Sequence, residues 1–247
     1  MIDETTNPRY DGGNRLIDGL PPADRHQIVP HLTMMTAEEA SSGILRAEPI
    51  TAAYFPIDAV FSVLVELARG ESYEVDTVGR SGLIGGELIF GTTAASRSVI
   101  CQIGGTFAQM PRDAFEECLQ NSGPFSLAVH HALLLQWYRA QQTIACNFAH
   151  SLVQRCARWA LLTHEAIERD TFKFRAEYLS MMLGEQTHVV MEPMATLQAV
   201  GAIRYAEDTM TIVSGRALRE AACECYTAPN EYAQRLAPRR DHKREAQ

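Results

Sequence analysis

The sequence predicts an α+β chain: an N-terminal β-barrel or jelly roll, then a long helix, then a winged helix-turn-helix. From about residue 34 to 110, short apolar runs rich in β-forming residues alternate with glycine-bearing turns. From Pro124 to about Ala149, apolar residues recur along one stripe of a helix that is long for a globular domain. After residue 175 the order is helix, glycine turn, helix and two short strands.

The β-rich region is preceded by Asn14 to His31, a short predicted helix that Pro21 and Pro22 interrupt. Its runs are AAYFPIDAVFSVLVEL (52–67), ESYEVDTV (71–78), SGLIGGELIFG (81–91), SVICQIGG (98–105) and TFAQM (106–110). Short strands at a spacing of roughly 8–12 residues, separated by glycine, are typical of a barrel or jelly roll.

The helical part begins at Pro111, because proline suits the first turn of a helix and 111–122 has a helical pattern. The helix that follows Pro124 is too apolar on one side to stand alone in water. It must pack on the barrel, on a copy of itself, or on both. Further helices are predicted over 151–168, 175–183, 186–199 and 215–236, and strands around 203–205 and 210–213.

The length of 247 residues exceeds one typical core of roughly 100–150 residues, so two domains are expected. Residues 1–12 are predicted to be a disordered N-terminus and 237–247 a basic flexible tail. Between them we expect one domain at 13–150, which includes the long helix at about 124–149, and a second at 151–236.

Composition favours an ordinary globular protein, with 46% hydrophobic and 21% charged residues. The acidic N-terminus lacks the pattern of a secretory signal, and no apolar run approaches the roughly 18 residues of a membrane span. We therefore expect a cytoplasmic protein without a membrane partner. No nucleophile elbow, Walker loop, HExxH or dinucleotide fingerprint occurs. The sequence thus predicts no catalytic residues and no enzyme.

The six cysteines predict buried, reduced thiols without a disulfide framework. Cys223 and Cys225 are separated by one residue, and nothing upstream supplies an evident second pair of metal ligands. The sequence therefore predicts no metal site. No cysteine precedes Cys101 to hold an N-terminal iron–sulfur cluster, and nothing marks His26 or His31 as haem ligands, so neither cofactor is expected.

Four segments resemble the Crp/Fnr superfamily of regulators, and the similarity runs from about Asn14 to Tyr226. They are AYFPIDAVFSVLVEL, VDTVGRSGLIG, QTIACNFAHSLVQRCARWALLTHE and LSMMLGEQTHVVMEPMATLQAVGAIRY. The third and fourth are the most specific, because they join the long helix to the bihelical motif in the family's order. The resemblance implies a cyclic-nucleotide-binding-like sensor barrel, a homodimer through the long helix, and DNA recognition by the second helix of the bihelical motif.

Nucleotide-binding members of this family place Gly-Glu on a barrel turn and Arg-Ser ten residues after the Glu. Gly86-Glu87 and Arg97-Ser98 stand at that spacing, and an arginine fork suits a phosphate. The intervening LIFGTTAAS departs from the family pattern, and Ala140 and Gln141 take the positions that would read a purine, with Thr143 nearby. Two readings stay open: Gly86, Glu87, Arg97, Ser98 and Thr143 bind a cyclic nucleotide or another small phosphate-bearing ligand, or Arg97 caps a turn or pairs with Glu87.

The family places arginines just after the turn glycine, where this chain has Gln186, Thr187 and His188, and Glu192 stands where an arginine is expected. Pro193 predicts that this helix kinks or ends near Glu192 and restarts, because an interior proline costs about 3 kcal/mol or more. The candidate DNA contacts are Lys173, Arg175, Gln186, Thr187, His188 and Arg204.

Charge weakens the case for DNA binding. Residues 171–213 contain three basic and five acidic residues. The basic residues are Lys173, Arg175 and Arg204, and the acidic residues are Glu177, Glu185, Glu192, Glu207 and Asp208. Two functions therefore remain open. One is a DNA-binding transcription regulator, and the other is a degenerate member that has lost sequence-specific DNA binding and acts through protein–protein interaction.

Overall fold

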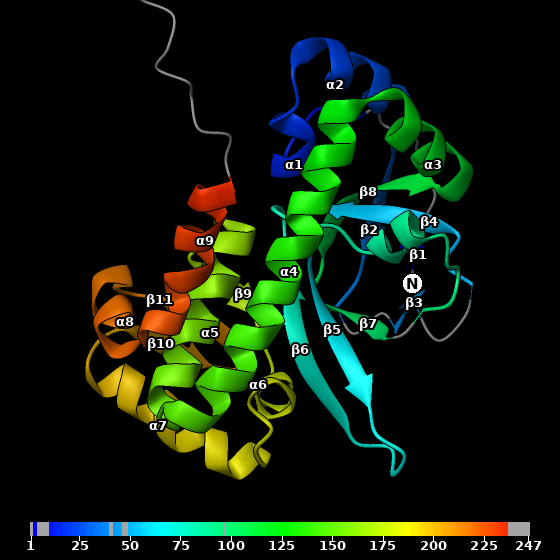
Figure 1. Cartoon of the computed structure of the whole chain (residues 1–247). Helices are drawn as coiled ribbons and strands as arrows, with labels where there is room; N and C mark the ends of the chain where they lie inside the picture. The colour runs from blue at the N-terminus through cyan, green and yellow to red at the C-terminus, as the bar shows by residue number, and fades with distance from the viewer. Residues whose placement is uncertain (1, 4–9, 40–41, 46–48, 96, 237–247) are drawn as a thin grey trace, which may run out of the picture.

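The computed structural model describes residues 2–3, 10–39, 42–45, 49–95 and 97–236. They form a barrel of two antiparallel sheets, a long helix and a winged helix-turn-helix, and the long helix runs between the other two parts (Figure 1). This confirms the predicted fold class. Within this part of the chain, no helix has the length and apolar character needed to cross a membrane.

The barrel is built from two four-stranded antiparallel sheets with strand orders β1-β2-β8-β4 and β3-β7-β5-β6. The strands are β1 (Ile2–Asp3), β2 (Thr33–Ala37), β3 (Ser42–Leu45), β4 (Ala52–Pro56), β5 (Val60–Glu66), β6 (Ser72–Val78), β7 (Ser98–Ile103) and β8 (Gly105–Pro111). Every residue of β4 is buried, and its Phe55 packs against Phe115 of α3 (Arg112–Asn121) and Phe125 of α4 (Gly123–Ala149). The 3-10 helix η2 (Gly86–Phe90) lies in the connection from β6 to β7.

The N-terminal helical region has the predicted interruption: α1 (Arg15–Asp18) and α2 (Pro22–Ile28) are separate, and the 3-10 helix η1 (Val29–His31) follows. Asn14 is fully buried and caps α1, since its Oδ1 accepts from the backbone N–H of Leu16 at 3.1 Å. Its side-chain amide also donates to the carbonyls of Pro56 at 2.8 Å and Gly82 at 3.2 Å. One side chain thus ties the helix to two barrel loops.

Two helices lead from the barrel, α3 (Arg112–Asn121) and the long α4 (Gly123–Ala149). Three buried phenylalanines fix their junction on β4. The ring centroids lie 5.8 Å apart for Phe115 and Phe125, 6.4 Å for Phe55 and Phe115, and 6.3 Å for Phe55 and Phe125. Such aromatic pairs stabilise a core beyond the area they bury.

The C-terminal part has the elements of a winged helix-turn-helix. They are α5 (Leu152–Ile167), β9 (Thr171–Lys173), α6 (Ala176–Leu183), α7 (Thr187–Ala199), β10 (Ile203–Ala206), β11 (Thr209–Ile212), α8 (Gly215–Ala221), the 3-10 helix η3 (Glu224–Tyr226) and α9 (Ala228–Leu236). Ser151 and Gln154 form a capping box at the start of α5, which explains why this helix begins there.

The winged part packs directly on the barrel. Val60 and Ile103 of the barrel belong to the same buried apolar cluster as α5, α6 and α7. Gly79 follows β6, and a Cβ at this position would lie 2.4 Å from the Cβ of Ala166, so only glycine allows α5 to approach. Glu168 pairs there with Arg80 and with Arg15, whose Nη2 lies 2.7 Å from its Oε1. Arg80, and then Arg15, lower the pKa of the Glu168 carboxyl.

The described residues of the N-terminal segment contact the rest of the barrel region. Ile2–Asp3 pair with β2, and Tyr10 is buried with its hydroxyl 3.0 Å from Asp18 Oδ1. Backbone pairing and aromatic burial hold these two parts of the segment 1–12, whose predicted disorder stays a prediction. Residues 1 and 4–9, like the predicted tail at 237–247, lie outside the described residues.

The helix α7 is continuous through Pro193, so the prediction that it ends near Glu192 and restarts is wrong, while the alternative of a kink stays a prediction. Pro193 is buried together with Val190, Met194 and Leu197 on the side of α7 that faces the domain core. Burial of the ring offsets the backbone hydrogen bond that proline cannot donate. The solvent-facing side of α7 therefore stays available.

The predicted tail helix over 215–236 is also wrong, because the segment divides into α8, η3 and α9. Ala222 and Cys223 are extended, which ends α8 and turns the chain back toward α4. Pro229 then lies in the first turn of α9, where proline is well tolerated.

The turn between β10 and β11 holds Glu207 and Asp208 at positive φ angles of 50° and 52°. Two-residue turns of this kind favour Asn-Gly. We expect Glu207→Asn with Asp208→Gly to raise the free energy of unfolding by about 1 kcal/mol. Urea denaturation should show a higher midpoint with an unchanged slope. Glu207→Gln with Asp208→Ser removes the same charges without relieving the backbone, and an equal gain in that variant would contradict the explanation.

Candidate functional site

The barrel brings together three of the five residues predicted to bind a ligand. Gly86 and Glu87 lie on η2, and Arg97 immediately precedes β7. Arg97 Nη2 donates to Glu87 Oε1 at 3.1 Å, so the guanidinium expected to hold a phosphate is paired with the neighbouring carboxylate. Of the two readings left open, this geometry matches the pairing of Arg97 with Glu87.

The cavity beside this pair is about 20 Å³, room for roughly one water molecule. The helix α4 fills the rest: a Cβ on Gly86 would lie 2.5 Å from Leu133 Cδ2, and Gln136 Nε2 donates to the carbonyl of Leu83 at 2.8 Å. With Leu133 and the Arg97–Glu87 pair in these positions, the cavity has no room for a cyclic nucleotide.

The other two predicted ligand residues lie elsewhere. Ser98 donates its hydroxyl to Glu66 Oε1 at 2.9 Å, on the exposed side of the sheet, because β7 alternates its side chains between two faces. Thr143 accepts a hydrogen bond from Arg158 Nη2 at 3.1 Å and lines a different cavity. The structure therefore does not bring the five residues together.

The larger cavity, about 150 Å³, lies between β6, α4, α5 and the C-terminal segment, and the sequence reasoning missed it. Arg139 of α4 holds Asp76 of β6 there through two bonds, Nε to Oδ1 at 3.0 Å and Nη2 to Oδ2 at 3.1 Å. Arg155 and Arg158 of α5 also line it. Their spacing of three places them on one face of α5, which is the sequence signal that could have found them.

Three polar atoms at this cavity are buried without a hydrogen-bond partner among the described residues: Glu74 Oε2, Arg155 Nε and Trp159 Nε1. Burial raises the pKa of Glu74 to about 7, although Thr77 donates to its other oxygen at 2.5 Å. Buried polar groups normally find partners. This cavity, with its arginines and carboxylates, can therefore accept water or a small polar ligand.

The predicted DNA contacts at the start of α7 are together and accessible. Gln186 is the N-cap of α7, and the side chains of Gln186 and His188 are exposed, with Thr187 half-buried between them. The preceding Gly184 ends α6 at φ 66° and lies against Tyr73 of β6. The barrel hairpin β5–β6 therefore touches the turn that positions α7.

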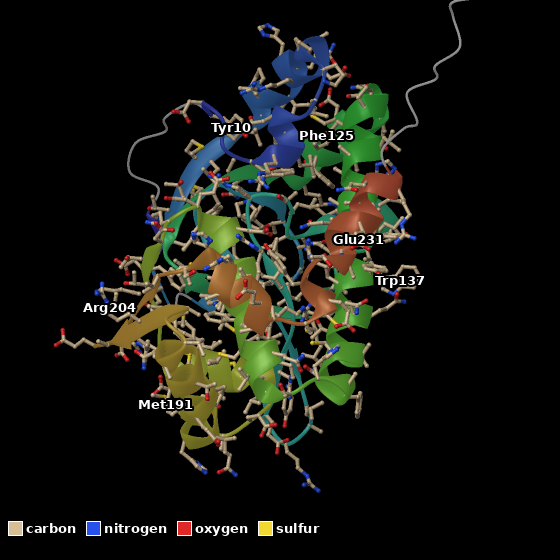
Figure 2. The ribbon with its side chains drawn as sticks, turned by 90° about the vertical axis from the view of Figure 1, so that its left-hand side faces the viewer. Tyr10, Phe125, Trp137, Met191, Arg204 and Glu231 are labelled. Carbon is tan, nitrogen blue, oxygen red and sulfur yellow. The ribbon has the colours of Figure 1, made fainter. Side chains whose placement is uncertain are left out.

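The three basic residues of the winged part differ in their availability. Lys173 and Arg204 are exposed on β9 and β10, which flank β11 in one sheet. Arg175 Nε lies 3.6 Å from Glu39 Oε1, so an acid of the barrel partly neutralises it. In Figure 2, Arg204 and Met191 both lie at the edge of the molecule opposite α4. This edge carries the exposed side of α7 and the strands β10 and β11.

The outward side of α4 is mostly apolar along its length. Its positions repeat every seven residues with alternating steps of three and four: Leu127, His130, Leu134, Trp137, Gln141, Ile144 and Phe148. Trp137 is 63% exposed, Ile144 61% and Phe148 91%, and Figure 2 shows Trp137 projecting away from the body. This is the spacing of a coiled-coil seam.

Four potential metal ligands converge at the end of α4: Cys146, His150, Cys223 and Cys225. Cys146 and His150 are four residues apart and share one face of α4, while η3 and its preceding residue bring the other two cysteines. The prediction that nothing upstream could complete a ligand set for Cys223 and Cys225 is therefore wrong. The spacing of four residues between Cys146 and His150 is the feature of the sequence that could have predicted this cluster. Burial raises the pKa of the Cys146 thiol to about 12 and raises that of Cys223.

No family model and no curated protein matches the sequence. Solved structures do match the fold. FixK2 from Bradyrhizobium japonicum has a TM-score of 0.65 at 10% identity, covering 78% of this chain and 98% of that chain. A CRP/FNR-family transcriptional regulator from Thermus thermophilus has a TM-score of 0.60 at 16% identity, covering 76% and 97%. The c-di-GMP-responsive global regulator CLP of Xanthomonas campestris has a TM-score of 0.60 at 12% identity, covering 78% and 100%.

Glu74 gives this site a pH signature. Its pKa is raised to about 7 in the folded protein, against roughly 4.3 in the unfolded chain. The contribution of Glu74 to the free energy of unfolding is therefore fully present below about pH 4.3 and is lost as the pH rises through about 7. Glutamine does not titrate, so Glu74→Gln should not lose this contribution. We expect the free energy of unfolding of Glu74→Gln, relative to that of the wild type, to be higher at pH 8 than at pH 5 by on the order of 2 kcal/mol.

Denaturant unfolding of both proteins at the two pH values measures this difference. Glu71→Gln, on the exposed tip of the same hairpin, is the matched control and should track the wild type. A stability difference between Glu74→Gln and the wild type that is equal at pH 5 and pH 8 would contradict a buried, protonated Glu74.

Proposed function

We propose that this chain, a divergent member of the Crp/Fnr superfamily by its fold, is a homodimeric DNA-binding transcription regulator of the cytoplasm. In this proposal residues 13–150 form the sensor domain and residues 151–236 the DNA-binding domain. The observation that carries it is one arrangement: the outward seam of α4 is free for a second copy, while the start of α7 and the winged sheet are exposed on the opposite edge.

The seam of α4 supports the homodimer. Large apolar side chains such as Trp137 and Phe148 are unfavourable in water, and their seven-residue repeat matches a second parallel helix. Gln141 sits in the middle of the seam, where a polar residue specifies register. A two-fold pair of chains would present two α7 helices to two half-sites about one helical turn of DNA apart.

The DNA contacts proposed here are few. Gln186 and His188 are placed to reach base edges from the start of α7, with Lys173 and Arg204 on phosphates. Glu192 lies on the exposed side of the same helix and repels the DNA backbone. We therefore expect modest affinity with a shallow dependence on salt, since few phosphates are neutralised.

A small phosphate-bearing ligand at Glu87 and Arg97 would have to break their ion pair and displace Leu133. In this proposal, ligand sensing by the barrel takes place in a state in which α4 has shifted. Because α4 also carries the seam, such a shift would couple the barrel to the dimer.

The second candidate function, a family member that acts through protein contacts without sequence-specific DNA binding, is favoured by one observation. The exposed Glu185, Glu192 and Glu207 surround the start of α7 and the wing, and Arg175 is engaged by Glu39. A polyanion is disfavoured on such a surface. The DNA experiment below separates the two candidates.

The dimer proposal predicts that Trp137→Glu combined with Ile144→Glu converts the protein to a monomer. Like charges placed across a two-fold seam repel, and the apolar contact is lost. Light scattering coupled to size exclusion measures the mass. Leu67→Glu changes an apolar side chain that is 48% exposed on the barrel hairpin, and this control should stay dimeric. A wild-type chain that is monomeric at micromolar concentration would refute the proposed seam.

The DNA proposal predicts that the protein binds a fragment of its own promoter region and that affinity falls as salt rises. Glu192→Arg should tighten binding and steepen the plot of log K against log salt by about one unit per added phosphate contact. Fluorescence anisotropy with labelled DNA measures both. Glu231→Arg, an identical charge change on α9, is the matched control and should have a much smaller effect.

Equal effects of the two arginines would show that α7 does not face DNA. No binding by the wild type at low salt, with the dimer intact, would favour the protein-interaction candidate instead.

A further inference from the structure

We propose that Cys146, His150, Cys223 and Cys225 bind a single zinc ion in a closed, tetrahedral, structural site. The site joins the end of α4 to the segment between α8 and α9 of the winged domain. This inference concerns a site outside the barrel pocket and the DNA-facing edge, and it does not depend on DNA binding.

The spacing of the four donor atoms fits one metal ion. Zinc bonds of about 2.3 Å to sulfur and about 2.0–2.1 Å to nitrogen place tetrahedral ligands roughly 3.8 Å apart for two sulfurs and roughly 3.6 Å for sulfur and nitrogen. The Sγ atoms of Cys146 and Cys223 are 3.5 Å apart, and Cys225 Sγ is 3.6 Å from His150 Nδ1. All four donor atoms lie within 4.8 Å of one another.

The same spacing argues against a larger cofactor. A regular tetrahedron with edges of 4.8 Å has its centre about 2.9 Å from each corner, so the cage holds one ion and has no room for a cluster of several irons. Three thiolates and one imidazole are a ligand set of structural zinc, with every coordination position taken by protein.

The second nitrogen of His150 is held as metal-bound histidines require. Its Nε2 lies 3.2 Å from Glu224 Oε1, and Nδ1 lies on the side of the cysteines, 3.6 Å from Cys225 Sγ. With a metal ion bound at Nδ1, the proton is on Nε2, where Glu224 can accept it. A carboxylate behind the imidazole fixes the tautomer and raises the basicity of the ligand nitrogen. Glu224 lies between Cys223 and Cys225, so one short segment supplies two ligands and the orienting carboxylate.

Neighbouring hydrogen-bond donors and one positive charge suit cysteine sulfurs that are bound to a metal ion. Gln142, one turn before Cys146 on α4, donates its amide to Cys225 Sγ at 3.0 Å. Arg158, only 8% exposed, donates Nε to the carbonyl of Cys225 at 3.3 Å and brings a positive charge beside the cysteines. Three thiolates and Zn²⁺ carry one net negative charge, which this guanidinium balances.

Ordinary core packing does not account for the cysteines. Cys146, Cys223 and Cys225 are 0%, 5% and 1% exposed, yet they form a cluster of their own, separate from the apolar cores of the barrel and of the winged domain. A disulfide between Cys146 and Cys223 would use two of the four groups and leave Cys225 and the oriented imidazole of His150 without a role. A metal ion uses all four.

The experiment measures zinc in the full-length protein, purified under reducing conditions from zinc-supplemented medium and dialysed. Elemental analysis should find about one zinc per chain. Cobalt in its place should give the absorption of a tetrahedral thiolate site, with sulfur-to-cobalt charge-transfer bands. Cys223→Ser and His150→Ala should lose the metal, while His150→Cys should keep it. Glu224→Gln should weaken zinc binding by roughly 10–100-fold in competition with a chromophoric chelator.

Cys118→Ser, a buried cysteine in α3, is the matched control and should keep about one zinc per chain. Circular dichroism confirms that each variant compared is folded, and His150→Cys keeps the test valid if a serine variant is not. The proposal is overturned if the folded wild type holds no stoichiometric zinc and gives no cobalt charge transfer. It is overturned equally if folded His150→Ala keeps the metal, or if mass spectrometry finds Cys146 and Cys223 joined as a disulfide.

Discussion

The bidentate ion pair between Asp76 of β6 and Arg139 of α4 fixes the long helix against the barrel. Both side chains are largely shielded from solvent, at 5% and 14% exposure, so breaking the pair would leave a buried charge uncompensated. Once α4 is held at this point, its rotation about its own axis is set. Leu133 and Gln136 then face the barrel and Trp137 faces outward.

Three consequences follow from that single orientation. The inward face closes the barrel pocket at Gly86, and the outward face exposes the apolar seam that we propose as the dimer contact. The third face carries Gln142, Cys146 and His150 toward the end of the winged domain. In a helix with 3.6 residues per turn, side chains three or four residues apart share a face, so the three sets of side chains lie on three different faces of α4. Any rotation of α4 would change all three contacts together.

The winged domain rests on the barrel through two further contacts. Gly79 admits Ala166 of α5, and Tyr73 at the hairpin lies against Gly184, the turn residue before α7. Because the barrel hairpin contacts this turn, a displacement of β6 would also displace the turn and the start of α7. The cavity between β6, α4 and α5, with Glu74 and its unpaired oxygen, lies at this same junction.

Much of this architecture could be predicted from the sequence, because periodicity reports the local backbone. The interruption at Pro21, the start of α3 after Pro111 and the order of the winged elements follow from such signals. The continuity of α7 through Pro193 could not be predicted, since it depends on a core that buries the ring. The cysteine–histidine cluster depends on the break after α8, which periodicity did not indicate, and the filled pocket at Gly86 depends on where α4 comes to lie.

The central claim, that a two-fold pair of these chains reads DNA with α7, is tested most directly by selection from a pool of genomic fragments. The purified full-length protein is mixed with the pool at low salt, and retained fragments are sequenced. The account predicts enrichment of fragments that share a two-fold symmetric site with half-sites about one helical turn apart. Retained fragments no different in sequence from the starting pool would contradict it.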